Sequence, residues 1–425
     1  MKILIVSKTP LTLNNSFGIS YSNILGGIPN LKIANIFLRD EEVTNVDPSL
    51  DIVFFKISEK SILDNFKDKK NPLGSRIEPS DIKKTNGQDF YTFGRKHRWQ
   101  ILYWGQELLW KFARSKTYHV SKDFVDTFSP DIIFQPIYYA SYINKMANFI
   151  KKYTGCKMVG YISDDNYTLK KFHLSPLYWI NRFIKRPLIR KTINNCEVLY
   201  TITQMQKNEY SKLFKPECKI LTKCYDFVKR PPFNLHKDTI ICIYAGGVGN
   251  GRWKTLLKLA KEINQANSIC INKMKLSIYT PTPLKKRIIR QFEKQDANLF
   301  DPIPYSELVK IQKESDLMIF VESFNLRDKL DSNMSFSTKL VDFFYLGKPI
   351  LAIGPKEIAS IKYLQENNAA LVSTNKKEIK EKISLIINNS TVLENYSKNS
   401  WDCGKAKHNR KEMCEKLIDD FVQNI

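Results

Sequence analysis

The stretch SFSTKLVDFFYLGKPILAIG, residues 335–354, joins a short helical pattern to an apolar run that is typical of a buried strand. Ser337 precedes the helical pattern, Gly347 stands where the helix should end, and KPILAIG follows at 348–354. We predict Ser337 as the N-cap, because its hydroxyl can accept a hydrogen bond from a free backbone N–H. A helix that leads directly into a buried strand is the repeating unit of α/β sheets.

The same alternation runs through most of the chain. Predicted strands lie at 2–7, 51–57, 131–136, 157–163 and 197–203, and again at 239–247, 275–280, 316–323, 348–354 and 369–374. Their continuous apolar runs are typical of parallel strands buried on both faces. The exception is 60–120, which is polar and then rich in Trp, Tyr and Arg, and which we interpret as an insertion leading into a helix at 99–115.

The chain has 425 residues, and single cores stop growing at about 250 residues, so two domains are expected. The segment FVKRPPFNLHKDT, 227–239, has the prolines and charges of a linker. The predicted fold is α/β, with two Rossmann-like domains facing a cleft. We place the first domain at 1–230, the second at 231–400, and a final helix at 401–425, which in this fold class crosses back to the first domain.

The charge balance favours anionic partners. The chain has 67 Lys and Arg against 43 Asp and Glu, a net charge of +24, which suits phosphorylated ligands, nucleic acid or an anionic membrane. Its abundance of Lys, Ile and Asn is also typical of AT-rich coding, which needs no partner. No nucleic-acid module is recognisable, so we predict no nucleic-acid partner. The eight Cys lack disulfide or metal-ligand spacing, so neither a disulfide framework nor zinc is indicated. We predict no metal and no cofactor.

The amino-terminal sequence MKILIVSKTP contains a strand-length apolar run, which is too short for a signal peptide. No apolar run approaches the ~20 residues that a membrane-spanning helix needs. We therefore expect a cytoplasmic protein.

Polar residues gather where predicted strands of the second half end, which is where open α/β sheets bind ligands. YAGGVGNGRWK, 244–254, places Gly246 and Gly247 after a strand and Arg252 and Lys254 at the start of a helix. Glycines let a phosphate approach the backbone, and the helix start attracts anions. The alternative is a tight turn with solvated charges.

Two carboxylates follow in the same half of the chain. Glu322 closes an apolar strand in FVESFN, 320–325, where it faces either a ligand or the solvent. Asp342 lies three residues after Lys339, so it can accept hydrogen bonds from a ribose beside a diphosphate held by Ser337, Thr338 and Lys339. The alternative is an intrahelical pair between Lys339 and Asp342.

Together GGVGNGR, ESFN and SFSTKLVDFFYLGKPILAIGP resemble the carboxyl-terminal domain of GT-B glycosyltransferases of the group 1, family-4-like kind, over about 240–356. The resemblance implies that Arg252, assisted by Lys254 or Lys258, holds the diphosphate of a sugar nucleotide. It also implies that Glu322 lies near the donor sugar and that Asp342 binds ribose. Asn325 departs from the family's usual Gly, and LRDKLDSNM is inserted before the helix.

The resemblance implies a base pocket near 301–308 and transfer with retention of anomeric configuration. Many such enzymes build bacterial capsules and surface polysaccharides.

The amino-terminal half is expected to bind the acceptor. Gly18, within NNSFGISYSNILGG at 14–27, resembles the family's glycine turn facing the donor phosphates. Asp164 and Asp165 in YISDDNYT, 161–168, follow a strand and can orient or deprotonate an acceptor hydroxyl. An Asx cap is the alternative role. His119 and His173 are weaker candidates, for which surface or packing roles are the alternative.

Two basic and aromatic stretches, 91–116 and 166–193, have the composition of helices that lie on an anionic membrane. The alternative is a helix packed by its aromatic side chains with a solvated basic face.

We therefore predict a cytoplasmic glycosyltransferase at the inner face of the cell membrane, which moves a sugar from a nucleoside diphosphate sugar to a glycan or lipid-linked acceptor in surface-polysaccharide synthesis. It is expected to need no metal, because Arg252 and a neighbouring Lys would stabilise the leaving diphosphate. The alternatives are a nucleotide-sugar epimerase of the same fold and a non-catalytic basic scaffold that binds membranes or polyanions.

Overall fold

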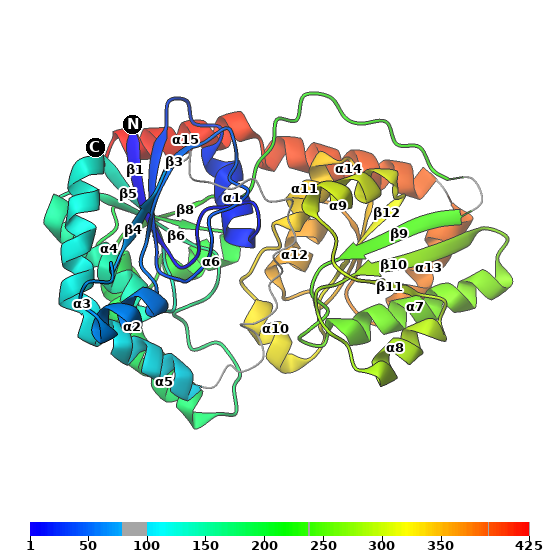
Figure 1. Cartoon of the computed structure of the whole chain (residues 1–425). Helices are drawn as coiled ribbons and strands as arrows, with labels where there is room; N and C mark the ends of the chain where they lie inside the picture. Colours follow the sequence, from blue (N-terminus) through cyan, green and yellow to red (C-terminus); the bar gives the residue numbers. More distant parts are fainter. Residues whose placement is uncertain (79–99, 237–238, 390, 425) are drawn as a thin grey trace. The chain divides into compact units, whose positions relative to one another are not determined.

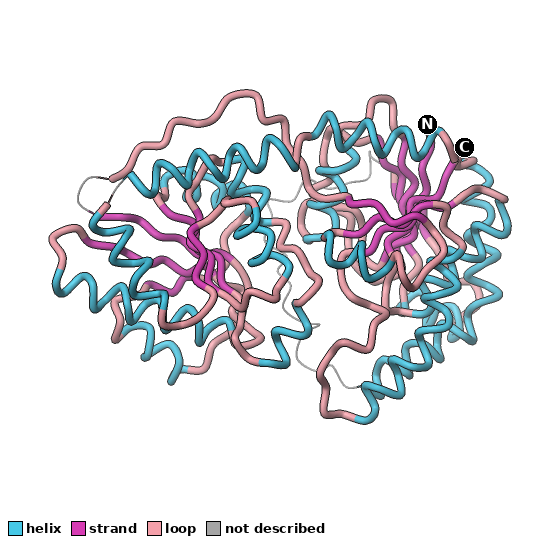
Figure 2. The backbone as a smooth tube through the Cα atoms, turned by 180° about the vertical axis from the view of Figure 1, so that it is seen from behind, coloured by secondary structure: helices cyan, strands magenta, loops and turns pink. Residues whose placement is uncertain are grey.

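The computed structural model describes residues 1–78, 100–236, 239–389 and 391–424. The chain forms two compact units. The first comprises Met1–Leu169, His173–Lys223 and Arg410–Ile425, and the second comprises Lys170–Phe172 and Cys224–Asn409. Each unit contains one sheet with helices around it, which the tube of Figure 2 shows in magenta and cyan.

The first unit is built on an eight-stranded sheet in the order β4-β3-β2-β1-β5-β6-β7-β8. Neighbouring strands are parallel except at one edge, where β3 and β4 are antiparallel. The strands are β1 (Lys2–Ser7), β2 (Lys32–Phe37), β3 (Asp51–Lys56), β4 (Ser75–Ile77), β5 (Ile132–Pro136), β6 (Met158–Ile162), β7 (Val198–Thr201) and β8 (Glu217–Ile220).

Alternate side chains of β1 enter two different cores, one on each face of this sheet. On one face, Ile3 and Ile5 pack with α1 (Ser16–Leu25) and α15 (Arg410–Val422). On the other face, Leu4 and Val6 belong to the core that includes α2 (Glu59–Lys67), α3 (Gln100–Phe128), α4 (Ser141–Thr154) and α5 (Pro176–Asn194). Figure 1 shows α1 and α15 on one side of the sheet and α2 to α5 on the other. The short helix α6 (Gln204–Tyr210) precedes β8.

The second unit has a six-stranded parallel sheet in the order β11-β10-β9-β12-β13-β14. Its strands are β9 (Thr239–Ala245), β10 (Lys273–Tyr279), β11 (Asn298–Phe300), β12 (Leu317–Val321), β13 (Ile350–Ile353) and β14 (Leu371–Ser373). Its helices are α7 (Arg252–Ile269), α8 (Lys286–Glu293), α9 (Tyr305–Glu314), α10 (Leu326–Ser332), α11 (Lys339–Tyr345), α12 (Ala359–Glu366), α13 (Glu378–Asn388) and α14 (Thr391–Lys407). The order of the strands reverses between β9 and β12, which is the switch point where such sheets bind ligands.

Each predicted strand segment contains a strand, and the α/β class is confirmed. Sequence reasoning missed β2, β4, β8 and β11. In β2 the buried Asn35 interrupts the apolar pattern, but its amide donates to the Ile5 carbonyl at 3.2 Å and to the Ser7 hydroxyl at 2.8 Å. The other three missed strands have only three or four residues.

The predicted single helix over 401–425 is wrong. The chain instead forms α14 and α15, which end and begin on either side of His408 and Asn409. The His408 carbonyl accepts the Tyr225 N–H at 3.0 Å, and its ring nitrogen lies 3.0 Å from the Tyr363 hydroxyl. These bonds hold His408 between the two helices.

The helix predicted at 99–115 extends much further, to Phe128. Within the predicted insertion, residues 79–99 lie outside the described part of the chain.

Candidate functional site

The turn after β9 is shaped by glycines. Gly246 follows the strand with φ +147°, and Gly251 precedes α7 in the left-handed region with φ +72°. A Cβ on Gly251 would lie 2.4 Å from the Ser323 hydroxyl, so this position requires glycine for both conformation and space. The turn therefore brings the start of α7 against the residues that follow β12.

Arg252 and Glu322 form an ion pair at the two neighbouring strand exits. The guanidinium Nε and Nη2 both donate to the Glu322 carboxylate, at 2.9 to 3.1 Å. The Glu322 side chain is only 6% exposed, and that of Arg252 is 30% exposed. Thr255, one turn along α7, donates to the Glu322 carbonyl at 3.0 Å. The carboxylate thus fixes the direction of the guanidinium.

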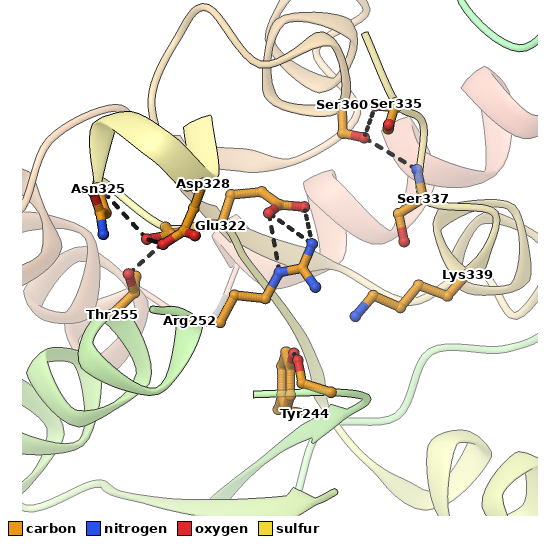
Figure 3. Close-up of polar contacts among 12 residues, drawn as sticks. Tyr244, Arg252, Thr255, Glu322, Asn325, Asp328, Ser335, Ser337, Lys339 and Ser360 are labelled. Carbon is orange, nitrogen blue, oxygen red and sulfur yellow. Dashed lines mark hydrogen bonds and ion pairs between the residues drawn. The ribbon is translucent and has the colours of Figure 1, made fainter. Parts of the chain in front are cut away.

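Lys339 brings a second cation to the same place from the start of α11. Its ammonium lies 4.7 Å from the centre of the Tyr244 ring and 3.4 Å from the Ala245 carbonyl. A Cβ on Gly246 would lie 3.2 Å from the ammonium nitrogen, so glycine leaves the cation room above the turn. Figure 3 shows the ends of Arg252 and Lys339 directed toward one another on the Tyr244 side of the turn.

The proximity of these charges affects the titration of Lys339. Burial, and then the positive charge of Arg252, lower the pKa of its ammonium to about 8, although Glu322 acts in the opposite direction. Two cations held close together and partly withdrawn from water favour a bound anion, which would relieve their repulsion. Asp328, a further carboxylate, accepts a hydrogen bond from the Ser323 hydroxyl at 3.0 Å.

Asp342 lies one turn further along α11 and is held by an aromatic cluster. Its carboxylate accepts the Tyr225 hydroxyl at 2.6 Å. The Tyr225 ring stacks on Tyr345 with centroids 4.3 Å apart, and its hydroxyl also interacts with Tyr305, the first residue of α9. Burial, followed by the charge of Asp342, raises the pKa of Tyr225, so its hydroxyl remains a donor. The structure thus links Asp342 to the 301–308 segment predicted to hold the base.

Several predicted donor-site residues lie apart from the Arg252 and Lys339 pair. Lys258 forms an ion pair with Glu262 one turn along α7, and the ammonium of the exposed Lys254 lies 5.6 Å from the Trp253 ring centre. Gly247 belongs to the turn itself, where its carbonyl accepts the Tyr244 hydroxyl at 2.8 Å.

The prediction of Ser337 as N-cap is wrong. Helix α11 begins at Lys339 with Thr338 as N-cap, and the Thr338 side chain makes no capping hydrogen bond. The backbone instead begins with a tight turn, in which the Ser337 carbonyl accepts the Leu340 N–H at 3.0 Å, while the Ser337 N–H donates to the Ser360 hydroxyl. Gly347 ends the helical segment as predicted, with φ +59°.

In the first unit, Gly18 does not form a turn. It lies in the first turn of α1, where its N–H donates to the Asn15 side chain at 2.8 Å. A Cβ on Gly18 would lie 1.9 Å from the Thr12 carbonyl oxygen, so close packing of the helix on the preceding loop accounts for this glycine.

The two aspartates after β6 have different surroundings. Asp164 is exposed. Asp165 is buried and has the predicted alternative role, because its carboxylate accepts the N–H groups of Tyr167 and Thr168 at 3.1 and 2.8 Å. It also accepts the Tyr210 hydroxyl at 3.0 Å and lies 3.5 Å from Arg182. With its oxygens occupied in this way, Asp165 holds the loop together.

The surroundings of the two histidine candidates match the alternative surface and packing roles. His119 is exposed on α3. His173 stacks on Tyr178 with ring centroids 4.2 Å apart, and its Nδ1 accepts the Ser175 N–H at 3.1 Å.

Among the described residues, no three His, Cys, Asp or Glu side chains are grouped so that they could hold a metal ion. No helix in the described part of the chain has the length and apolar character to span a membrane.

Several solved structures share this architecture. Sucrose-phosphate synthase from Thermosynechococcus elongatus is similar with a TM-score of 0.64 at 11% identity, over 99% of this chain and 98% of that one. Anabaena HepE in complex with UDP is similar with a TM-score of 0.59 at 9% identity, over the whole of both chains. TarM is similar with a TM-score of 0.51 at 14% identity. The match covers 68% of this chain and 54% of the TarM chain, so it spans about half of TarM.

At these identities the likeness establishes the fold, and the chain has the two-domain GT-B fold. No family model matches the sequence, and no curated protein matches it.

Sequence reasoning did not foresee Tyr225 or Tyr244 at the site. Tyr225 lies just before the predicted linker, which gave no reason to pair it with Asp342. Tyr244 was assigned only to the strand. Its position two residues before Gly246 is the one signal in the sequence that could have indicated an aromatic ring beside the glycine turn.

Proposed function

We propose that the protein is a glycosyltransferase that moves a sugar from a nucleoside diphosphate sugar to a hydroxyl group. The observation that supports it most directly is the convergence of Arg252 and Lys339 over the glycine turn, at the switch point of the second sheet. A diphosphate leaving group is the anion that such a pair suits. Asp342, one turn away, is the proposed partner of the ribose hydroxyls.

In the proposed reaction, the bond between the anomeric carbon and the diphosphate oxygen breaks, and the electron pair leaves with the diphosphate. The acceptor oxygen bonds to the anomeric carbon and gives up its proton to a carboxylate, for which we propose Asp164 of the first unit. Arg252 and Lys339 stabilise the charge that develops on the diphosphate. Glu322 acts by orienting Arg252, because both of its oxygens accept hydrogen bonds from that guanidinium.

The finer features of this proposal come from the resemblance of 244–254, 320–325 and 335–354 to family-4-like enzymes. We propose that transfer retains the anomeric configuration and needs no metal or cofactor. The proposed acceptor is a glycan or a lipid-linked glycan of bacterial surface-polysaccharide synthesis, at the cytoplasmic face of the cell membrane. HepE was solved with UDP, which makes UDP the first nucleotide to test.

Thermal unfolding with UDP, GDP, ADP and CMP, and with their sugar conjugates, tests the donor site. One nucleoside diphosphate at ~100 times its Kd should add about 2.7 kcal/mol to the free energy of unfolding. Asp342→Ala should abolish that stabilisation, whereas Asp402→Ala, at an exposed position of α14, should preserve it. If no nucleotide stabilises the wild-type protein, the proposed site is wrong.

Tyr225→Phe should weaken binding of the same nucleotide by about three- to tenfold, because it removes the hydroxyl that orients Asp342. Isothermal titration calorimetry measures the change. The matched control is Tyr153→Phe, which removes a tyrosine hydroxyl donating to Asp126 at 2.7 Å in the first unit and should leave affinity unchanged. Equal affinities for wild type and Tyr225→Phe would show that Asp342 needs no such support.

A further inference from the structure

Helix α5 has an apolar face that points to solvent. Leu177, Ile180, Phe183 and Ile184 are 40%, 47%, 52% and 66% exposed, and Leu174, just before the helix, is 86% exposed. Positions 177, 180, 184 and 187 recur with helical periodicity, so they share one side of the helix, which Pro187 continues. Such a continuous apolar stripe differs from the scattered apolar residues of an ordinary surface.

The opposite side of α5 faces the protein. It carries Arg182 and Lys185 in the middle of the helix, and the core residues Ile189 and Ile193 toward its end. Arg182 and Lys185 are 2% and 5% exposed. The Arg182 guanidinium donates to the Thr168 carbonyl at 2.6 Å, and Lys185 lies 3.3 Å from Glu107 of α3. Up to Lys185, this is the reverse of an ordinary surface helix, which turns its apolar side inward. The charged side of α5 is satisfied within the unit, whereas its apolar side has no cover in the described structure.

Helix α3 meets α5 at the ion pair between Glu107 and Lys185, and it carries a second row of exposed apolar side chains. Trp104, Leu108 and Phe112 are 37%, 50% and 71% exposed and are spaced four residues apart, so they lie along one side of α3. The two helices therefore present apolar side chains on the same layer of the first unit (Figure 1).

The charge around the α5 stripe indicates what covers it. The segment 166–193 contains seven Lys and Arg and no Asp or Glu. Two of the seven, Arg182 and Lys185, are buried, whereas Arg190 and Lys191 are exposed where the stripe ends. A second copy of the chain would offer the same cations and no carboxylate from this segment. An anionic lipid surface offers both an acyl phase for the apolar side chains and phosphates for the cations.

We propose that the protein docks on an anionic lipid bilayer through the exposed face of α5, with Leu174, Leu177, Ile180, Phe183 and Ile184 in the acyl boundary and Arg190 and Lys191 at the headgroups. The observations that support this docking surface are independent of the proposed function. Its use, to reach an acceptor carried on a lipid, rests on the proposed function.

Co-sedimentation of the full chain with vesicles tests the surface. Vesicles of phosphatidylcholine with phosphatidylglycerol should bind the protein more tightly than phosphatidylcholine alone, and salt should weaken the binding. Ile180→Ser with Ile184→Ser should weaken binding at least about tenfold. Arg190→Gln with Lys191→Gln should weaken it by about fivefold per residue on anionic vesicles only.

The matched control is Ile269→Ser with Ile271→Ser, two exposed isoleucines of the second unit, which should leave vesicle binding unchanged. The proposal is overturned if wild type ignores anionic vesicles at low salt, or if the control pair weakens binding as much as the α5 pair. A concentration-dependent dimer that Ile180→Ser with Ile184→Ser disrupts, without vesicle binding, would assign the face to a second copy. Stabilisation by nucleotide is measured in parallel, so failure of the donor site is distinguishable from failure of this surface.

Discussion

Arg252→Ala is expected to lower the kcat/KM of sugar transfer by at least about 100-fold. The guanidinium donates hydrogen bonds from Nε and Nη2 to the two carboxylate oxygens of Glu322, so its orientation is fixed before any ligand binds. A preorganised cation at a departing diphosphate stabilises the transition state more than the ground state, and loss of one such group typically costs about two to three orders of magnitude. The measurement is release of nucleoside diphosphate in the presence of acceptor.

The same substitution leaves the buried Glu322 carboxylate without its ion pair, so a loss of stability has to be separated from a loss of catalysis. Arg252→Ala should lower the free energy of unfolding by about 2 kcal/mol, less than for a fully buried pair because the Arg252 side chain is 30% exposed. Adding Glu322→Gln should restore most of that stability and none of the activity. Arg252→Lys keeps the charge without the paired hydrogen bonds and should have intermediate activity. A loss of transfer below threefold in the stable double variant would remove Arg252 from the proposed mechanism.

The fold could be predicted because its strands are buried on both faces. Runs such as 317–321 and 350–353 are apolar throughout, and parallel strands of this kind have few other interpretations. The exceptions were strands whose pattern is broken by a polar residue with buried partners, as in β2. Periodicity detects burial but not the hydrogen bonds that allow a buried amide.

From the sequence, only those parts of the candidate site could be predicted that lie at the ends of strands or at glycine turns. Arg252 and Glu322 follow adjacent strands, so their proximity follows from sheet topology. Lys339 was predicted at a helix start, but its contact with Tyr244 depends on the direction of the side chain. The role of Asp165 depends on Arg182 and Tyr210, which are distant in sequence, and no local pattern distinguishes it from Asp164.

Binding of the nucleoside diphosphate is expected to weaken as the pH rises above about 8, approaching tenfold per pH unit. Burial and the charge of Arg252 hold the pKa of Lys339 at about 8 in the free protein. A bound diphosphate favours the charged ammonium and raises that pKa, so above it the protein must take up a proton to bind. The affinity should therefore be level near pH 7 and should fall between the free and bound pKa values.

The other groups around Lys339 do not produce this dependence. Burial acts to lower the pKa of Arg252, but Glu322, Tyr244 and Asp328 together raise it by more, so the net shift is upward and the guanidinium stays charged. Burial raises the pKa of Tyr244, which therefore stays neutral. Lys339→Arg replaces the ammonium by a cation that does not titrate in this range and should give an affinity that is level from about pH 7 to about pH 9.5. Calorimetry in buffers of different ionisation enthalpy counts the proton taken up by wild type. An identical pH profile for wild type and Lys339→Arg would show that the ammonium lies too far from the bound anion for their charges to interact, because it is this interaction that couples its proton to the ligand.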